Sequence, residues 1–264
     1  MPRMMHRTRM KSLRQPEIRI IPLRVQGEVQ VGDSIAIHIL SALKDRRATL
    51  LDGDILIVKH KIVSKAEGAV VALDSVKPST RAKLWAKKNS LDARVVELAL
   101  SEARSIVRRH RKVMITETRH GFVCANSGVD VSNVDGGKSA VLLPKDPDRS
   151  AQKIRRALKQ KLSIAVPVII TDSFGRPWRE GLTEVAIGVA GMKPLVDYRG
   201  RKDAQGYSLH STIEAIADEL ACAAGLVCGK LEQTPACIIR GFRYQSAAGT
   251  ALELIRPAAF DLFR

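Results

Sequence analysis

The chain has few aromatic residues and no long hydrophobic run. Phe, Trp and Tyr make up 4% of its 264 residues, too few for a platform that binds single-stranded nucleic acid by base stacking. No stretch is long and apolar enough to predict a membrane span, and the basic N-terminus lacks the apolar segment of a secretory signal. These absences argue against a membrane-spanning or secreted protein.

Cysteine is also scarce. The four cysteines, Cys124, Cys222, Cys228 and Cys237, show no paired C-x-x-C spacing. A chain of this length buries enough apolar surface to fold without disulfides, so neither a disulfide framework nor a zinc ribbon is indicated. Scattered cysteines of this kind predict reduced thiols in a cytoplasmic protein.

The common nucleotide-binding fingerprints are missing. A P-loop requires a glycine, four residues, and then Gly-Lys-Ser/Thr. Ser132 stands where the segment "DGGKS" would need the first glycine, and in "GLVCGKL" Gly225 and Gly229 are one residue too close. No G-x-G-x-x-G motif is found either. A nucleotide site in this chain must therefore be built in another way.

Acidic residues are also few: the chain has 27 Asp and Glu but 44 Lys and Arg, for a formal net charge of +17. This balance favours an anionic partner: nucleic acid, an anionic membrane surface, or a small polyanion such as a nucleotide or phosphodiester. Residues 1–15 form a basic N-terminal extension, interpreted as a solvated, poorly ordered tail or as a nucleic-acid-binding arm. Residues 16–264 are expected to form the folded unit.

The hydrophobic pattern predicts an irregular α+β fold. Residues 17–25 and 53–63 resemble strands and make the first third a strand-rich layer. Residues 165–177 predict a strand that ends in a polar loop, and residues 236–241 predict one more strand. Residues 91–110 have helical spacing throughout. A second helix is expected from Asp146-Pro147 through Leu162. Ser211 and Glu214 have the spacing of a capping box before a third helix within 215–227.

Two aspartates lie in polar loops beside hydroxyl or amide side chains. Asp130 is followed by Ser132 and Asn133, and Asp172 lies between Thr171 and Ser173. Hard divalent cations prefer such oxygen ligands, with one or two carboxylates completed by phosphate and water. The alternative is that each aspartate caps a turn through its own backbone. The low cationic charge of the segment "GFVCANSGVDVSNV" favours the metal site, because no neighbouring lysine competes for Asp130.

Cationic candidates occur in three segments. "KHKIVSKAEG" contains Lys59, His60, Lys61, Ser64 and Lys65, which suit phosphate binding or a solvated helix face. In "ETRHG", Arg119 could bind a carboxylate or phosphate beside Glu117 and His120. In "FGRPWREG", Trp178 lies between Arg176 and Arg179, an arrangement that suits either stacking on a ring or packing of Trp178 beneath an arginine. No nucleophile and base pair is indicated.

Several longer motifs resemble one family. "KIVSKAEG", "ITETRHGFVCANSGVDVSNV", "LLPKDPDRSAQKIR", "TDSFGRPWREGLTEVAIGVAG" and "DYRG" follow one another within the stretch from about Ile21 to Gly241. In this order they resemble the coenzyme F-420-0:L-glutamate ligases, the γ-glutamyl ligases of deazaflavin coenzyme biosynthesis. The resemblance implies GTP-dependent ligation of L-glutamate to the lactyl carboxylate of the precursor through an acyl phosphate. It leaves open the addition of further γ-linked glutamates.

The resemblance also implies which residues form the site. The metal ligands fall on Asp130, Asp172 and Ser173, where many members have threonine in place of this serine. The loop "GKLEQTP" aligns loosely with a nucleotide-proximal loop, and adds Glu232 to the metal ligands and Lys230 to the nucleotide contacts. The full set of implied nucleotide contacts is Ile21, Pro22, Leu23, Arg24, His60, Lys61, Lys65, Asn133 and Lys230.

The family further implies a two-domain α+β homodimer that uses manganese or magnesium, with potassium as an assisting ion. Asp130 and Asp172 are the expected catalytic residues, and Arg119, Arg176 and Arg179 are candidates for binding the anionic substrate. Two other functions stay open at this point: a basic nucleic-acid-binding module, and a non-catalytic relative that binds a deazaflavin or nucleotide. The retained Asp130, Asn133 and Asp172 argue against a loss of catalysis.

Overall fold

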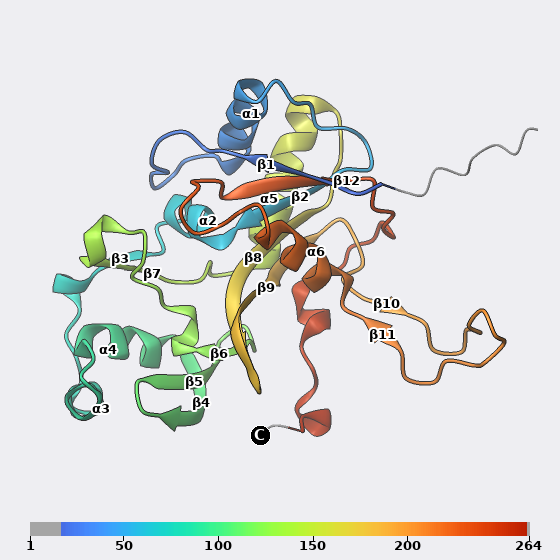
Figure 1. Cartoon of the computed structure of the whole chain (residues 1–264). Coiled ribbons are helices and arrows are strands. Elements are labelled where there is room, and N and C mark those ends of the chain that lie inside the picture. Colours follow the sequence, from blue (N-terminus) through green and yellow to red (C-terminus); the bar gives the residue numbers. More distant parts are fainter. Residues whose placement is uncertain (1–16, 263–264) are drawn as a thin grey trace, which may run out of the picture.

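A computed structural model describes residues 17–262. Its centre is a five-stranded sheet in the order β1 (Arg19–Leu23), β12 (Ala236–Arg240), β2 (Ile55–Lys59), β8 (Val168–Arg176) and β9 (Arg179–Ala190) (Figure 1). Only β2 and β8 pair in parallel, and the other neighbours are antiparallel. Residues 55–58 and 168–171 are buried without alternation, which shows that both faces of the sheet centre are covered.

Four helices surround this sheet: α1 (Ile35–Asp45), α2 (His60–Ala66), α5 (Pro147–Leu162) and α6 (Ile216–Gly225). Helices α5 and α6 both pack on β9, and α1 packs on α5. One hydrophobic core joins the sheet to these helices, and it includes the fully buried Leu23, Ile39, Leu158 and Ile169. No helix within residues 17–262 has the length and apolar character needed to cross a membrane.

Residues 70–142 form a smaller lobe beside the sheet (Figure 1). It contains β3 (Val70–Ala72), α3 (Thr80–Asn89), α4 (Ala93–Ser101), β4 (Ala103–His110), β5 (Val113–Thr118), β6 (Val123–Ala125) and β7 (Ser139–Val141). Its helices pack through small hydrophobic clusters separate from the main core, one around Leu98 and one around Val96. The two-subdomain arrangement and its boundary stay predictions.

The C-terminal half adds two further features. Strands β10 (Val196–Asp197) and β11 (Ile213–Glu214) pair at the base of an excursion that extends away from the sheet in Figure 1. After β12 the chain has only short 3-10 turns, at Ala251–Leu254 and Ala258–Phe260 within the described residues. The predicted basic extension, residues 1–15, lies outside the described residues.

The mixture of helices and strands agrees with the α+β prediction, and the predicted strands at 17–25 and 236–241 are confirmed. The strand within 165–177 is confirmed too, but the polar loop predicted at its end is wrong, because β8 continues to Arg176 in pairing with β9. The helix that begins at Asp146 is also confirmed, and the Asp146 carboxylate accepts a hydrogen bond from Arg149 N at 2.9 Å. The single helix predicted over 91–110 is wrong. Helix α4 ends at Ser101, and β4 then pairs with β5. Ile106 and Val107 fit helical spacing by coincidence, and their β-branched side chains favour the strand once a partner is present.

Two other local predictions are wrong. The strand expected over 53–63 stops at Lys59, and His60 begins α2, because His60, Val63 and Ser64 then share a buried helix face. With α1 to α3 the first third is therefore mixed rather than strand-rich. The capping box of Ser211 and Glu214 is absent: Glu214 belongs to β11, and α6 begins after Ala215 without a side-chain cap.

Candidate active site

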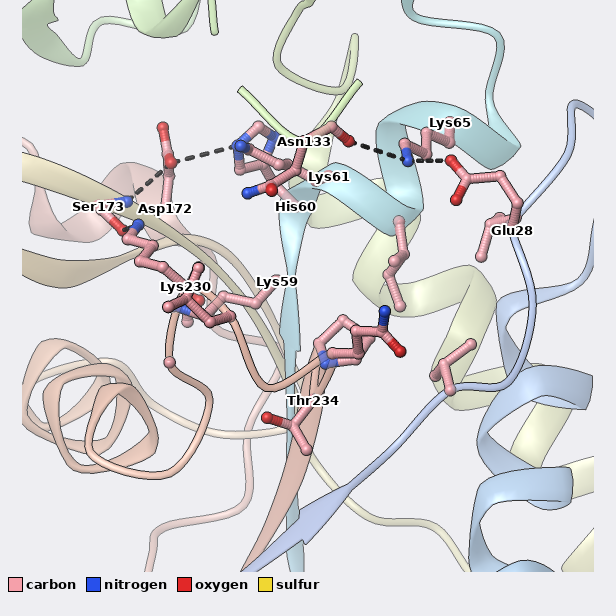
Figure 2. Close-up of a pocket in the computed structure, with 18 of the residues that line it drawn as sticks. Glu28, Lys59, His60, Lys61, Lys65, Asn133, Asp172, Ser173, Lys230 and Thr234 are labelled. Carbon is pink, nitrogen blue, oxygen red and sulfur yellow. Dashed lines mark hydrogen bonds and ion pairs between the residues drawn. The ribbon is translucent and has the colours of Figure 1, made fainter. Parts of the chain in front are cut away.

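A cavity of about 530 Å³ lies at the carboxyl ends of the parallel strands β2 and β8. Crevices at this edge of parallel strands are a common place for ligands. The cavity is bordered by residues 25–29, the start of α2, the end of the buried part of β8, and the loop 229–235 (Figure 2). Its polar lining side chains are Glu28, Lys59, His60, Lys61, Lys65, Asn133, Thr171, Asp172, Ser173, Lys230, Gln233 and Thr234.

Strand pairing brings the central residues of the site together. Lys59, the last residue of β2, is the register partner of Thr171 on β8. The next residue of each segment, His60 and Asp172, therefore also lies at the cavity. His60 is 2% exposed, and its Nε2 approaches Asp172 Oδ1 to 3.1 Å. The contact is short but is not an aligned hydrogen bond, because Nε2 has no hydrogen-bond partner of good geometry.

Asp172 is held in its ionised form. Burial by itself would raise the pKa of this carboxyl, but the attraction of His60 and a 2.7 Å hydrogen bond from Ser173 N outweigh it, so the pKa is below its ordinary value. The nearby charge of Asp130 opposes this shift. The two carboxylates thus repel one another electrostatically, but Asp172 is still an anion at neutral pH.

Asp130 is bound by the ammonium of Lys61. Lys61 Nζ lies 2.7 Å from Asp130 Oδ2, 2.8 Å from Ser132 Oγ and 3.0 Å from Ser132 O. Burial raises the pKa of Asp130, whereas the contacts with Lys61 and with Ser132 N lower it, and the net shift is downward. The prediction that no lysine competes for Asp130 is wrong. The loop itself has no neighbouring lysine, but the fold brings Lys61 of α2 against it.

The two aspartates differ in their backbone setting. Asp130 accepts a hydrogen bond from Ser132 N at 2.7 Å and so stabilises its own loop. The polar loop predicted around Asp172 is wrong, because Asp172 lies within strand β8, paired with Val185 of β9, and accepts a hydrogen bond from Ser173 N. Each carboxylate also contacts a cationic or titratable side chain, Lys61 or His60. Turn capping and ligand binding are therefore compatible at Asp130, and Asp172 caps no turn.

Cationic side chains enter the cavity from three elements. Lys65 of α2 pairs with Glu28 and approaches Asn133 O at 3.5 Å (Figure 2). Lys230 donates to Ser173 Oγ at 2.6 Å. Lys59, at the floor, forms an ion pair with the buried Glu184. Together with Lys61 these lysines give the cavity the charge expected of a polyanion site.

Cys124, whose thiol lies close enough to Asp172 to be affected by its charge, is unsuited to act as a nucleophile. Cys124 on β6 is 5% exposed. Burial first, and then the charge of Asp172, raise the pKa of its thiol to about 12. A thiol in this state stays protonated at neutral pH.

The comparisons with known proteins identify the family. A sequence model described as F420-0:Gamma-glutamyl ligase matches residues 25–241. The chain belongs to this family. It is 47% identical over 239 residues to the coenzyme F420:L-glutamate ligase of Methanothermobacter thermautotrophicus, covering 89% of this chain and 94% of the relative. The protein of the same name from Methanopyrus kandleri is 45% identical over 254 residues, with coverages of 94% and 98%.

The structure of this γ-glutamyl ligase family member brings some predicted nucleotide contacts together and leaves others apart. His60, Lys61, Lys65, Asn133 and Lys230 all line the cavity. Ile21, Pro22, Leu23 and Arg24 do not: Leu23 is fully buried in the core, and Arg24 donates to Gln233 Oε1 at 3.1 Å beside the cavity. Their predicted contact with nucleotide, which strand β1 could make through its backbone, stays a prediction.

The predicted metal and substrate ligands are also distributed unevenly. Asp172 and Ser173 line the cavity, Asp130 reaches it through Lys61, and Glu232 is exposed and accepts a hydrogen bond from Leu231 N at 3.0 Å. Arg119 pairs with Glu102 in the smaller lobe. Arg176 and Arg179 lie at the exposed turn between β8 and β9, away from the cavity lining. Their role as substrate ligands stays a prediction.

Two charged residues near the site were missed by sequence analysis. Glu28 pairs with Lys65, and Glu184 lies beneath Ser173. For Glu184 a signal existed: it is the charged residue of "LTEVAIGVA", a segment otherwise typical of a buried strand. A charge in such a segment requires a partner. For Glu28, in an exposed loop, the sequence carries no comparable signal.

Proposed function

We propose that the chain is a GTP-dependent coenzyme F-420-0:L-glutamate ligase. The observation that supports this most directly is the cavity at the ends of β2 and β8, where Asp172 lies among four lysines in a member of the γ-glutamyl ligase family. Relatives that share almost half of its residues carry the name coenzyme F420:L-glutamate ligase. Family and site support the same proposed chemistry, in which anionic substrates are joined with hydrolysis of a nucleoside triphosphate.

The lysines are suited to the triphosphate. Lys61, Lys65 and Lys230 come from two segments that face one another across the cavity, and ammonium groups on either side neutralise and orient a phosphate chain. In the present arrangement Lys65 is paired with Glu28 and Lys61 with Asp130. Nucleotide binding would therefore exchange these internal partners for phosphate oxygens.

The residues also fit a divalent cation. Within residues 17–262 no group of three or more His, Cys, Asp and Glu side chains has the arrangement of a metal site. Magnesium and manganese, however, are commonly held by one or two carboxylates plus phosphate oxygens. Asp130 and Asp172 with the Ser173 hydroxyl would hold the ion. The oxygens of Asp130 and Ser132 already bind one cationic group, the ammonium of Lys61. When bound, the ion would neutralise charge on the phosphates.

The reaction follows from these groups. A carboxylate oxygen of the precursor attacks the γ-phosphorus, the bond to the β-phosphate oxygen breaks, and GDP leaves with that electron pair. The amine of glutamate then attacks the acyl carbon, inorganic phosphate leaves, and the nitrogen loses a proton to give the amide. The lysines hold the triphosphate in line and stabilise its charge, so no nucleophilic side chain is required. The homodimer and the potassium ion remain expectations from the family, and the cytoplasmic location remains an expectation from the scattered cysteines.

Mass spectrometry tests the proposal. The purified chain is incubated with the precursor, L-glutamate, GTP and manganese, and a mass gain of one or more glutamyl units is expected. Omission of GTP, or its replacement by a non-hydrolysable analogue, is the matched control and should give no product. No mass gain under any nucleotide, together with tight RNA or DNA binding that GTP does not displace, would favour the nucleic-acid-binding function instead.

A further inference from the structure

Glu184 is a buried carboxylate directly behind the cavity. It lies on β9 as the register partner of Ser173 on β8, and is 7% exposed. It does not line the cavity itself. A carboxylate in such a place is retained only with strong partners, because an unpaired buried charge is very costly.

All its side-chain partners do line the cavity. Thr171 Oγ1 donates to Glu184 Oε2 at 3.0 Å, and Ser173 Oγ donates to Oε1 at 2.6 Å. The ammonium of Lys59 forms an ion pair with Oε1. One carboxylate thus holds three neighbouring groups of the cavity floor, contributed by two strands.

The contact with Ser173 also sets the direction of its hydroxyl. A hydroxyl has one hydrogen and two lone pairs. With the hydrogen given to Glu184, the oxygen presents lone pairs elsewhere, and Lys230 Nζ donates to it at 2.6 Å. The sequence Glu184, Ser173, Lys230 therefore runs from the buried sheet to the open cavity as one chain of hydrogen bonds.

Two local features of the fold make this arrangement possible. The pairing of β8 with β9 shifts register between Ile170 and Thr171, which leaves Ile187 as an extra residue on β9 and sets which face Glu184 takes. Gly225 of α6 lies against the Glu184 side chain. A methyl group on Gly225 would come within 2.8 Å of Glu184 Cγ, so glycine leaves the space that the carboxylate needs.

We propose that Glu184 is a positioning residue, which fixes Lys59 and the Ser173 hydroxyl, and through it Lys230, for the phosphate groups of the nucleotide. The identity of that anion rests on the proposed function. The role differs from ligand binding, because Glu184 itself repels phosphate. Loss of the Glu184 charge should therefore impair catalysis without weakening nucleotide affinity. Lys59 would lose its counter-charge, and Lys230 would lose the oriented hydroxyl that holds it.

Glu184→Gln is the first test, because it retains the shape and removes the charge. We expect kcat for ligation to fall by about tenfold or more, and the Kd for GTP to stay unchanged or decrease. Ser173→Ala should lower kcat too, and the double variant should be little worse than Glu184→Gln alone, since residues in one network are not additive. A wild-type kcat in Glu184→Gln, or additive effects in the double variant, would overturn the proposal.

Gly225→Ala is the second test and guards against misfolding. It leaves Glu184 charged, favours the helix and displaces the carboxylate. Its kcat should fall with the melting temperature retained. Asp218→Asn is the matched control: Asp218 on the same helix accepts a hydrogen bond from Ala186 N of β9 at 2.8 Å and lies outside the cavity lining. If this variant loses as much kcat as Gly225→Ala, or if Gly225→Ala is unaffected, the role of Glu184 is merely structural.

A spectroscopic measurement separates this inference from the proposed function. In a ¹H–¹⁵N spectrum of the lysine ammonium groups, Lys59 should give a signal protected from exchange, which Glu184→Gln removes and Asp218→Asn retains. Absence of a protected Lys59 signal in the wild type contradicts the positioning role whatever the activity. Failure of the wild type to ligate glutamate, with the Lys59 signal behaving as expected, contradicts the proposed function and leaves the positioning role supported.

Discussion

The ammonium of Lys61 lies 2.7 Å from the carboxylate of Asp130, and Ser132 supplies it with two further oxygens. Lys61 comes from α2 next to the sheet, and Asp130 from the smaller lobe. The contact thus joins the two parts of the chain at the cavity. A cation that takes the place of this ammonium would release Lys61 toward the phosphates.

We expect Asp130→Asn and Asp172→Asn each to reduce ligation by on the order of a hundredfold or more, since each removes a charge that the proposed divalent ion would require. Far-UV circular dichroism should show a retained fold. Asp74→Asn is the control, because Asp74 is an exposed partner of Arg94 remote from the cavity. Near-normal turnover of either site variant would leave that aspartate with its local backbone hydrogen bond as its only role.

Removal of Ser173 Oγ should be milder. Because water can replace one hydroxyl, Ser173→Ala is expected to lose about tenfold in kcat, less than either aspartate variant. Ser173→Thr retains the hydroxyl and should retain most activity. Steady-state kinetics at saturating GTP compares the three. A threonine variant as impaired as the alanine variant would show that side-chain size, rather than the hydroxyl, matters here.

The charge of the cavity leads to a prediction on ionic strength. Lys65 faces the cavity with Glu28 as its partner, and its attraction for anionic substrates should weaken as salt increases. The KM for GTP should therefore rise with salt, and Lys65→Ala should show a shallower rise than the wild type. Lys87→Ala, in the exposed part of α3, should keep the full slope. Identical slopes in all three proteins would contradict steering by the cavity lysines.

The basic N-terminal extension should be dispensable for the chemistry. It is charged, poor in apolar residues and outside the segment that matches the family, residues 25–241. Deletion of residues 1–15 should leave GTP turnover unchanged. The comparison is made at equal protein concentration and at two salt concentrations. A large loss of turnover would assign the extension a part in the site.

Two carboxylates should affect stability with opposite pH dependence. Burial raises the pKa of Asp148 in spite of hydrogen bonds from Ala251 N and Val189 N. The stability it contributes is complete at low pH and is lost as pH rises through its folded pKa. The hydrogen-bonded guanidinium of Arg199 instead lowers the pKa of Asp197 to about 2. The stability that Asp197 contributes is therefore present above its pKa in the unfolded chain, about 3.9, and is lost as pH falls toward 2.

Thermal unfolding between pH 2 and 6 tests the direction of the pH dependence for both carboxylates. The melting temperature of Asp148→Asn, relative to the wild type, should increase with pH, whereas that of Asp197→Asn should decrease. The second effect should be the smaller and should fade in high salt, since Asp197 and Arg199 are exposed. Parallel trends in the two variants would show that one of the two assignments is wrong.

The sequence by itself determined the family, most of the sheet strands, the helix that begins at Asp146, and the segments that carry Asp130, Asp172 and Lys65. These features are local: runs of β-branched residues, a cap followed by proline, and motifs whose chemistry is contiguous. The change from helix α4 to strand β4 after Ser101 was not predictable in this way, since Ile106 and Val107 fit the helical spacing of the preceding residues and only pairing with β5 places them in a strand.

Tertiary structure alone decided how charges are paired at the site. The segment around Asp130 contains no lysine that could bind it, and Lys61 reaches it because α2 packs beside β7 of the smaller lobe. Glu184 meets Ser173 because β9 folds back on β8 in the register that follows the shift at Thr171. Ion pairs and cross-strand hydrogen bonds depend on distances of a few ångströms between segments remote in the chain. Such distances are set by packing, and no local sequence pattern encodes them.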